Sequence, residues 1–398
     1  MSAKPPVTDW ATDFDHTDPR WNENPFPIWD ELRERCPVAK SERFEDGAYF
    51  PSRFQDVRDI SYDTEHFSSR RVIVREKKIN PPQTAAPITS DPPEHRPARM
   101  PLLPAFGPRA VEKLTPGTRA LCNKLIDGFI ARGGCDAATD YAQHIPTRVI
   151  ANMLGVDEND GDRYRRWIKM SLEEGIHDNA VAMQGLKEMT LYFMDELKKR
   201  GSAPGDDLIC LMRDQRVDGK PLSPEQLIGT LRLILIAGID TTWSAIGASL
   251  WHLATHPEDA RRLATEPGLM DTGVEELLRA YAPVTMAREV KKDVTVNGCP
   301  MKAGSMVLLS FPAANRDPDM FPDAEKVVLD RQENRHAAFG LGIHRCVGSN
   351  LARMELRVAL EEWLKRIPEF RLAPGERVTW SEGTVRGPRQ LPVLFAKG

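Results

Sequence analysis

One cysteine of the chain lies where its sulfur could be held as a thiolate. Cys346 ends the segment FGLGIHRC, and an amphipathic pattern over 348–366 predicts a helix directly after it. Unpaired N–H groups and the dipole at a helix start favour an anion, and the thiolate is the form of cysteine that ligates iron. Gly340 and Gly342 let the backbone approach a flat cofactor, and His344 could meet a carboxylate. The plainer interpretation is a lone cysteine acting as a small buried hydrophobe.

The longest apolar stretch of the chain carries an acid beside a hydroxyl. The capping box at 223–226 and the lack of a helix breaker before Pro257 predict one helix of about 50 Å. Inside it, Gly238 costs about 1 kcal/mol of helix stability, and Asp240 costs more if it lacks a partner. Breaches of local rules often mark function. Asp240 and Thr241 together could relay protons; the plainer alternative is a helix kink at a hydroxyl that bonds its own backbone, beside a capped aspartate.

Two further residue pairs have helical spacing. Glu276 and Arg279 are three residues apart and would pair on one helix face, although an isolated pair of this kind is most often a weak surface bridge. His95 and Arg99 are four residues apart and would also share a face. Prolines at 97 and 101 interrupt a regular helix around this second pair.

The remaining pattern describes the elements that must position these residues. Sixteen of the 32 prolines lie in residues 1–108, so we expect loops, short strands and short helices there, with a long irregular loop over 70–90. That loop is either a floppy surface segment or a substrate lid. Apolar spacing predicts helices over 109–285, and short apolar runs predict strands over 293–310 and 377–395. The expected fold class is mainly α with small β-sheets.

Bulk composition excludes several classes of protein. A net charge of −4 and a pI near 6.2 argue against nucleic acid as the main partner, because phosphate binding needs a basic face. The six cysteines form no C-x-x-C pair, which argues against zinc sites and a disulfide framework. The N-terminus has no apolar signal region, and the longest unbroken apolar run spans only Leu233–Ile239, where a membrane span needs about 20 residues. We therefore expect a cytoplasmic monomer, not anchored to a membrane, with a single domain over 1–398.

Taken together, these segments resemble the cytochrome P-450 superfamily. Residues 339–348 fill every fixed position of that family's haem-binding loop, Phe-Gly-x-Gly-x-His-x-Cys-x-Gly. Residues 237–242 match its Ala-Gly-x-Asp/Glu-Thr pattern, residues 276–279 match Glu-x-x-Arg, and residues 95–99 match His-x-x-x-Arg. The resemblance implies the cytochrome P-450 fold, with haem held between the long central helix and the cysteine loop.

The resemblance also implies roles for individual residues. Cys346 would be the axial ligand of the iron in haem b, Asp240 and Thr241 would deliver protons to dioxygen, and Glu276 with Arg279 would fasten the cysteine loop. The implied haem contacts are His95, Arg99, Ala237, Gly238, Arg288, His336, Phe339, Gly340, His344 and Gly348. The implied substrate contacts come from the 70–90 loop and from Ile236, Ile239, Val284, Met286, Thr384 and Val385.

A protein of this kind would be a haem-thiolate monooxygenase. The thiolate pushes electron density onto iron and favours cleavage of dioxygen, so a small, largely apolar or aromatic substrate would be hydroxylated or oxidatively demethylated. The sequence carries no flavin or iron–sulfur motif, and the resemblance implies a separate ferredoxin and ferredoxin reductase that draw on NAD(P)H. Arg96, Arg345 and Arg353 could form the docking face for the ferredoxin, or bind propionates and local carboxylates instead.

Three other functions stay open at this point. A haem-thiolate enzyme could use peroxide, and a haem gas sensor would turn over no substrate; the acid–alcohol pair disfavours both. A helical binding protein without haem would require all the matching segments to coincide by chance. The 70–90 loop also holds five basic residues, of which one could recognise a carboxylate, or all could form a solvated face: Arg70, Arg71, Arg75, Lys77 and Lys78.

Overall fold

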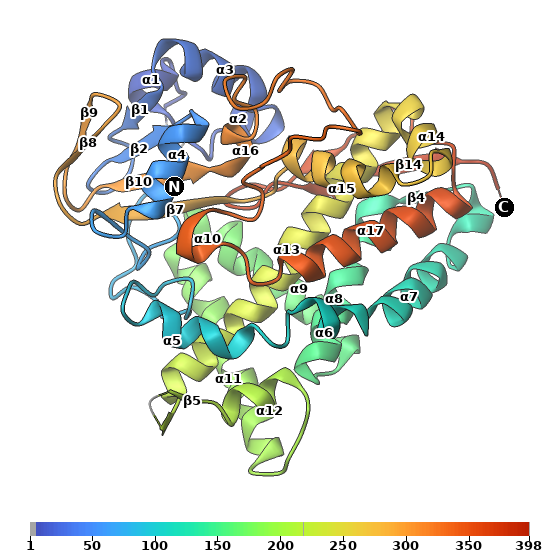
Figure 1. The fold of residues 1–398 in the computed structure, drawn as a ribbon, viewed down its shortest axis with the longest axis horizontal. Helices are drawn as coiled ribbons and strands as arrows, with labels where there is room; N and C mark the ends of the chain where they lie inside the picture. Colours follow the sequence, from blue (N-terminus) through green and yellow to red (C-terminus); the bar gives the residue numbers. More distant parts are fainter. Residues whose placement is uncertain (1–4, 218, 398) are drawn as a thin grey trace.

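The computed structural model describes residues 5–217 and 219–397. Most of this chain is helical, with several small sheets. Figure 1 shows the largest sheet and the short N-terminal helices together on one side of the molecule, at the upper left, and the long helices on the other. The predicted class, mainly α with small β-sheets, is confirmed.

The helices follow the predicted regions closely. Helices α7 to α15 lie within the span predicted to be helical, where β4 and the β5–β6 hairpin interrupt them, and α17 matches the helix predicted after the cysteine. The α-helices are α1 (Trp10–Asp13), α2 (Pro19–Glu23), α3 (Phe26–Arg35), α4 (Phe54–Tyr62), α5 (His95–Arg99), α6 (Pro108–Glu112), α7 (Thr115–Asp127), α8 (His144–Leu154), α9 (Gly161–Leu172), α10 (Glu174–His177), α11 (Asn179–Arg200), α12 (Leu208–Arg213), α13 (Pro224–Thr255), α14 (Pro257–Thr265), α15 (Leu269–Ala280), α16 (Phe311–Ala314) and α17 (Ser349–Arg366).

The largest sheet has the strand order β1-β2-β10-β7-β3, in which β10 runs parallel to β2 and antiparallel to β7. Strands β8 to β10 and β12 to β14 confirm the two regions predicted to form strands. The strands are β1 (Val38–Ser41), β2 (Ala48–Pro51), β3 (Phe67–Ser68), β4 (Gly134–Asp136), β5 (Arg216–Val217), β6 (Lys220–Pro221), β7 (Thr285–Val290), β8 (Val294–Val296), β9 (Cys299–Met301), β10 (Met306–Ser310), β11 (Phe370–Leu372), β12 (Thr379–Trp380), β13 (Pro388–Gln390) and β14 (Pro392–Phe395).

Strand β7 was not predicted from the sequence. Its polar residues Arg288 and Glu289 break the apolar run that would have indicated a strand. Pairing with β10 aligns Met286 with Leu309 and Arg288 with Val307. This strand matters for function, because Met286 and Arg288 both line the cavity described below.

Helix α13 crosses the middle of the molecule (Figure 1). Its start has the predicted capping box: the Gln226 N–H donates to the Ser223 hydroxyl, and the Gln226 side chain accepts from the Ser223 N–H. The helix packs against α8, α9, α11 and α17. By length and composition α13 could cross a membrane, but 72% of its most apolar window is buried inside the protein, as in a core helix.

Two hydrophobic clusters share α13. Its N-terminal half packs Leu231 and its neighbours with Trp167 of α9, and its C-terminal half packs Ile246 and its neighbours with Trp363 of α17. Burial of each large apolar side chain contributes about 1.5–3 kcal/mol. Because residues on both sides hold the helix, its polar groups are kept in fixed positions.

The 70–90 segment is the irregular loop expected from the sequence, since it contains no helix or strand. It is nevertheless fixed to the helical body. Val74 is fully buried, and the Thr230 hydroxyl of α13 donates to the Ala86 carbonyl at 2.9 Å. These contacts argue against a floppy surface segment, and the lid stays a prediction.

A buried carboxyl on α17 lowers the stability of the fold. Glu355 is fully buried, and neither of its oxygens has a hydrogen-bond partner in the described part of the chain. Burial raises the pKa of Glu355 well above its usual range, so the folded state keeps a proton there that the unfolded chain loses as the pH rises above the ordinary value. We expect Glu355→Met to raise the free energy of unfolding by about 1–3 kcal/mol.

Chemical denaturation across pH 5 to 8 tests this assignment. The folded wild type binds one more proton than the unfolded chain at this site, so its stability should fall with rising pH by up to about 1.4 kcal/mol per unit more than that of Glu355→Met. Parallel pH profiles for the two proteins would contradict the assignment.

Candidate active site

A cavity of about 250 Å³ lies between α13 and residues 338–352, the segment that carries the cysteine. One wall comes from α13, and the opposite wall comes from the cysteine segment. Its lining includes twelve residues that the sequence assigned to the site: Arg99, Ala237, Gly238, Thr241, Val284, Met286, Arg288, Phe339, Gly340, His344, Cys346 and Gly348. The structure therefore brings these predicted residues together around one space.

Cys346 lines this cavity, and the loop holds its backbone firmly. Its N–H donates to the Phe339 carbonyl at 2.7 Å, and α17 begins three residues later. Burial raises the pKa of the Cys346 thiol, while a hydrogen bond from the Gly348 N–H and the positive charge of Arg99 act to lower it. A metal ion on the sulfur would supply the remaining stabilisation that the thiolate needs.

The two loop glycines serve different purposes. Gly340 and Gly342 have φ values of +70° and +67°, which favour glycine. A Cβ on Gly342 would lie 2.3 Å from the Ser61 carbonyl oxygen of α4, and Gly340, unlike Gly342, lines the cavity. The expectation that both glycines admit a flat cofactor is corrected for Gly342, which instead lets the loop pack against α4.

Basic side chains gather at the cavity and form no ion pair with a carboxylate of the described residues. Arg99, Arg288 and His344 line it, and the His95 ring packs 4.5 Å from the His344 ring. The two arginines donate to backbone carbonyls, and His344 Nε2 lies 2.8 Å from the Ser69 hydroxyl. Burial lowers the pKa of Arg288 to about 10, and burial with the nearby positive charges lowers the pKa of His344 to about 3. The cluster is therefore suited to binding an anion.

The donor set fits a haem. Haem b is a flat apolar ring with iron at its centre and two carboxylates at its edge. The cavity offers a thiol for the iron, apolar surface from Ala237 and Phe339 for the ring, and the basic cluster for the carboxylates. Behind that cluster, His95 Nε2 is buried and has no hydrogen-bond partner within residues 5–217 and 219–397, as expected of a donor or acceptor whose partner is a bound group.

His336 is not placed at the cavity, which corrects its predicted haem contact. Its Nε2 lies 3.2 Å from Oε2 of Glu275 on α15, and it is not among the lining residues. Arg353 binds the same carboxylate through Nε at 2.6 Å and Nη2 at 2.7 Å. Burial acts to raise the pKa of Glu275, but hydrogen bonds from Arg353 and His336 lower it to about 2. These contacts hold the imidazole away from the cavity and also engage Arg353.

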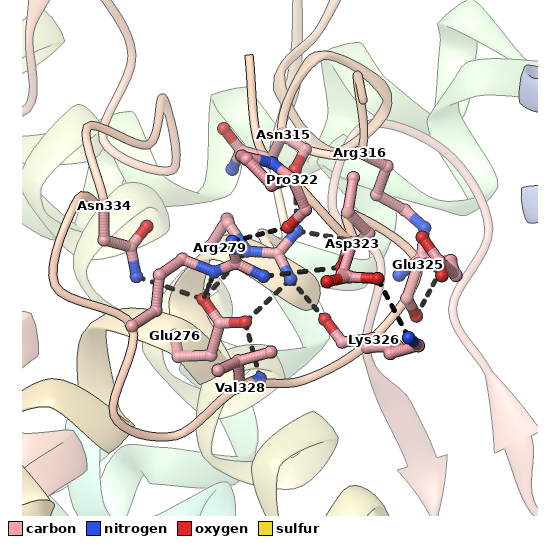
Figure 2. A network of polar contacts seen from close by, with 12 residues as sticks. Glu276, Arg279, Asn315, Arg316, Pro322, Asp323, Glu325, Lys326, Val328 and Asn334 are labelled. Carbon is pink, nitrogen blue, oxygen red and sulfur yellow. Dashed lines mark hydrogen bonds and ion pairs between the residues drawn. The ribbon is translucent and has the colours of Figure 1, made fainter. Parts of the chain in front are cut away.

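Glu276 and Arg279 of α15 form a buried ion pair, shown in Figure 2. Arg279 Nε and Nη2 each donate to one carboxylate oxygen at 2.8 Å, and both side chains are 0% exposed. Arg279 also donates to three backbone carbonyls, those of Asn315, Ala324 and Lys326. Glu276 accepts from the Val328 N–H and the Arg331 side chain. The pair is thus no surface bridge: it ties α15 to the segment that leads into the cysteine loop.

Gly238 and Thr241 sit on the face of α13 that lines the cavity. A Cβ on Gly238 would lie 2.4 Å from Cδ1 of Ile150 on α8, so a larger residue here would force the Ile150 side chain to move, independently of any cofactor. The Thr241 hydroxyl donates to the Ala237 carbonyl at 2.7 Å, which is the predicted local bond that loosens a helix. Thr241 therefore lines the cavity with its hydroxyl bonded to its own helix.

Asp240 is fully buried and does not line the cavity. Its Oδ1 accepts from Nη2 of Arg389 on β13 at 2.7 Å, and the same nitrogen lies 2.7 Å from Oε1 of Glu173. Its Oδ2 is buried with no partner among the residues that the structure describes. Burial raises the pKa of Asp240 to about 6, although Arg389 acts to lower it. This carboxyl can therefore exchange a proton near neutral pH, as a relay group must.

A second cavity of about 220 Å³ adjoins the first and is bounded by the 70–90 loop, α9, α11 and α13. Six residues line both cavities: Ile88, Leu233, Ala237, Thr241, Val284 and Met286. Ile236, Thr384 and Val385, three predicted substrate contacts, line the second cavity. Ile239 lines neither one. It is fully buried in the hydrophobic cluster shared with α8 and α9, so its predicted substrate contact is corrected.

Several polar partners at the site were not foreseen from the sequence. A buried aspartate signals that a cation must lie nearby, but Arg389 is 149 residues away in the chain from Asp240. Glu173 and Ser69 belong to no recognisable motif. Only the fold shows that Glu173 contacts Arg389 and that Ser69 contacts His344.

Comparison with known proteins agrees with this geometry. Residues 162–380 match the family described as cytochrome P450. The mycinamicin IV hydroxylase/epoxidase of Micromonospora griseorubida is 35% identical over 92% of this chain and 94% of that protein. The vitamin D(3) 25-hydroxylase of Pseudonocardia autotrophica is 34% identical over 94% of both. The solved structure of the Bacillus subtilis bacillaene polyketide synthase cytochrome P450 PksS, 29% identical, covers 96% of this chain and 100% of its own with a TM-score of 0.87. The chain therefore belongs to the cytochrome P450 family, which implies haem, and is a P450 monooxygenase.

Proposed function

We propose that this monooxygenase works in the cytoplasm with electrons from a separate ferredoxin and ferredoxin reductase, and that it hydroxylates or oxidatively demethylates a small organic molecule with a largely apolar body. The observation that carries the proposal is the placement of Cys346 and Thr241 around one cavity that adjoins a second cavity with a mostly apolar lining. A substrate in that second cavity would reach the space between the thiol and the hydroxyl.

Five residues would hold the cofactor. Cys346 would bind the iron, and Arg99, Arg288 and His344 would bind the propionates. His95, whose ring packs against His344 and whose Nε2 has no partner among the described residues, would offer a further group to the same carboxylates. Haem bound there supplies the activation of dioxygen, which the protein's own side chains cannot perform. The surrounding apolar side chains would keep bulk water from the reacting atoms.

Asp240 and Thr241 would move protons to the cavity. Asp240 would hold a proton on Oδ2, the oxygen that Arg389 leaves unbound, and water would carry this proton to Oγ1 of Thr241, because adjacent helix residues do not face each other. Thr241 would present it to the cavity after releasing the Ala237 carbonyl. Arg389 would orient the carboxyl and keep its pKa from rising further.

The ferredoxin would dock beside the cysteine loop. Arg96 and Arg345 are exposed there, so an acidic partner would be attracted to them. Arg353, the third arginine considered for this face, is held by Glu275 and lies over the Phe339 ring. We therefore assign docking to Arg96 and Arg345 alone.

The first test is the reduced carbon monoxide difference spectrum of the purified protein, which reports haem and thiolate ligation together. The second is turnover with ferredoxin, reductase and NAD(P)H compared with turnover by peroxide alone. Product formed only with the electron-transfer chain supports the proposal. Activity with peroxide only, or tight carbon monoxide binding without any substrate oxidation, would replace it with a peroxygenase or a gas sensor.

Asp240→Asn should lower turnover by roughly 100-fold, because general acid–base groups contribute about 10²–10⁴. The acid form of Asp240 dominates below its pKa of about 6, so wild-type turnover limited by proton delivery should fall as the pH rises above that value. The variant should lose this inflection. The measurement is turnover from pH 5 to 8 at saturating ferredoxin, with the exposed Asp214→Asn as a control that keeps the wild-type profile. An unchanged profile for Asp240→Asn would remove this residue from the relay.

A further inference from the structure

The second cavity has a strongly one-sided charge. Five basic residues line it, and no aspartate or glutamate of the described chain does: Arg70, Arg71, Arg75, Lys78 and Arg232. The rest of the lining is mostly apolar, with a few hydroxyl and amide groups. Uncompensated positive charge is costly in such an environment, so the first question is which of these side chains already have acidic partners.

Two of the five are neutralised by carboxylates outside the cavity. Arg71 Nη1 lies 3.0 Å from Glu289 Oε2. Lys78 Nζ lies 2.8 Å from Asp46 Oδ2 and 3.6 Å from Glu289 Oε1. Their charges are therefore satisfied within the protein, and Arg70 is exposed to solvent.

Arg75 and Arg232 differ from these residues. Arg75 donates to the carbonyls of Ser171 and Gly175, and Arg232 donates to the Thr190 hydroxyl at 3.0 Å and the Thr84 carbonyl at 3.1 Å. Neither forms an ion pair with a carboxylate of residues 5–217 or 219–397, whereas Arg71 does. Burial lowers the pKa of both guanidinium groups, that of Arg75 to about 10.

Both arginines line the cavity and retain N–H groups that the contacts above do not use. A guanidinium has five N–H groups, and the contacts above engage two nitrogens of each side chain. Arg232 Nε is buried and has no partner in the part of the chain that is described. A planar guanidinium with free N–H groups and no counter-ion is matched in geometry and charge by a carboxylate.

We infer that the substrate is an organic acid whose carboxylate is bound by Arg75 and Arg232, with its apolar body extending past Thr241 into the cavity of Cys346. This inference rests on the proposed function, because it names the substrate class for the same site. The six residues shared by the two cavities form the boundary that such a molecule would cross. Oxidation therefore falls on the part of the molecule remote from the carboxylate.

The competing explanation is that the two arginines only fasten the lid. Arg75 ties the 70–90 loop to α9 and α10, and Arg232 ties it to α11 and α13. If the arginines only fasten the loop, replacing either one should weaken the binding of every ligand by the same factor. Recognition of a carboxylate predicts a selective loss for acids.

The test uses the haem-loaded protein and matched ligand pairs: decanoic, dodecanoic, 4-phenylbutanoic and 2-naphthylacetic acids, each with its primary amide. Binding is followed by the change in haem absorption and, independently, by the rise in Tm. We expect at least one acid to bind tenfold or more tightly than its amide. Arg75→Gln and Arg232→Gln should each weaken binding of that acid by about tenfold or more, because each removes charged hydrogen bonds to the carboxylate. Each should weaken binding of the amide by less than about threefold.

Two control variants keep the result decisive. Arg71→Gln removes a charge from the same cavity that Glu289 already neutralises, while Lys78 still faces Glu289, so the preference for the acid should survive. Arg75→Lys keeps the charge and should retain part of the preference even if the glutamine variant folds poorly. The inference is overturned if no acid binds better than its amide, or if the glutamine variants weaken acid and amide equally. Oxidation of neutral compounds under either of those outcomes would leave the proposed function standing.

Discussion

Cys346→Ser should yield a folded protein whose reduced carbon monoxide complex lacks the spectrum of a thiolate-ligated haem. Serine nearly preserves the shape of the side chain, but its hydroxyl stays protonated where a thiol can be deprotonated by a metal. The loop itself should persist, because the Cys346 N–H to Phe339 carbonyl bond involves only the backbone. Without the thiolate, turnover with ferredoxin and reductase should fall by at least about 10³-fold.

The control for this experiment is a second free cysteine far from the site. Cys36→Ser alters a partly buried thiol that contacts the Val38 carbonyl, and it should leave haem absorption and turnover unchanged. Circular dichroism should show the same helix content for both variants. Visible absorption that is identical in Cys346→Ser and the wild type would mean that another residue ligates the iron.

The short-range patterns of the sequence proved sufficient for much of the site. The cysteine loop and the cap of α13 each depend on residues within ten positions of one another, so contacts between near neighbours in the sequence determine their geometry. Thr241 illustrates the same point, since its bond to the Ala237 carbonyl spans one helical turn. Ile239 could also have been placed correctly. Ala237 and Thr241 define the face of α13 at the cavity, and a residue two positions from Ala237 points about 200° away from that face.

Other features depended on contacts that no local pattern encodes. His336 lies on irregular chain three residues before Phe339, and its direction is set by Glu275 on α15. A residue larger than Gly238 would force the Ile150 side chain on α8 to move. The pKa of Asp240 depends on its burial and on the charge of Arg389, which lies on β13. In each case the sequence marked the residue as a candidate for the site, and only tertiary contacts determined which groups it meets.

Arg279→Leu should be the most destabilising single substitution near the site. It would leave the fully buried Glu276 carboxylate with three donors among the described residues, namely Arg331, Asn334 and the Val328 N–H. The backbone carbonyls of Asn315, Ala324 and Lys326 would also lose the donor that they have now. Breaking one side of a buried pair costs about 3–5 kcal/mol. We expect a loss of that size in the free energy of unfolding, measured by chemical denaturation. As a control, Arg262→Leu breaks an exposed pair with Glu266 on α14 and should leave the unfolding curve unchanged within error.

The same substitution should also loosen haem, because the network of Figure 2 fixes the segment before the cysteine loop. Asn315, whose carbonyl accepts from Arg279, uses its side chain to accept the Ala337 N–H at 2.7 Å, two residues before Phe339. Loss of Arg279 would therefore disturb the cysteine loop through a single residue, Asn315. A double variant, Arg279→Leu with Glu276→Leu, separates the two effects. It removes the buried carboxylate that has lost Arg279 and should regain stability relative to Arg279→Leu. Haem dissociation, followed by transfer to apomyoglobin, should stay fast. Haem retention equal to that of the wild type in both variants would show that the buried pair stabilises the fold without positioning the loop.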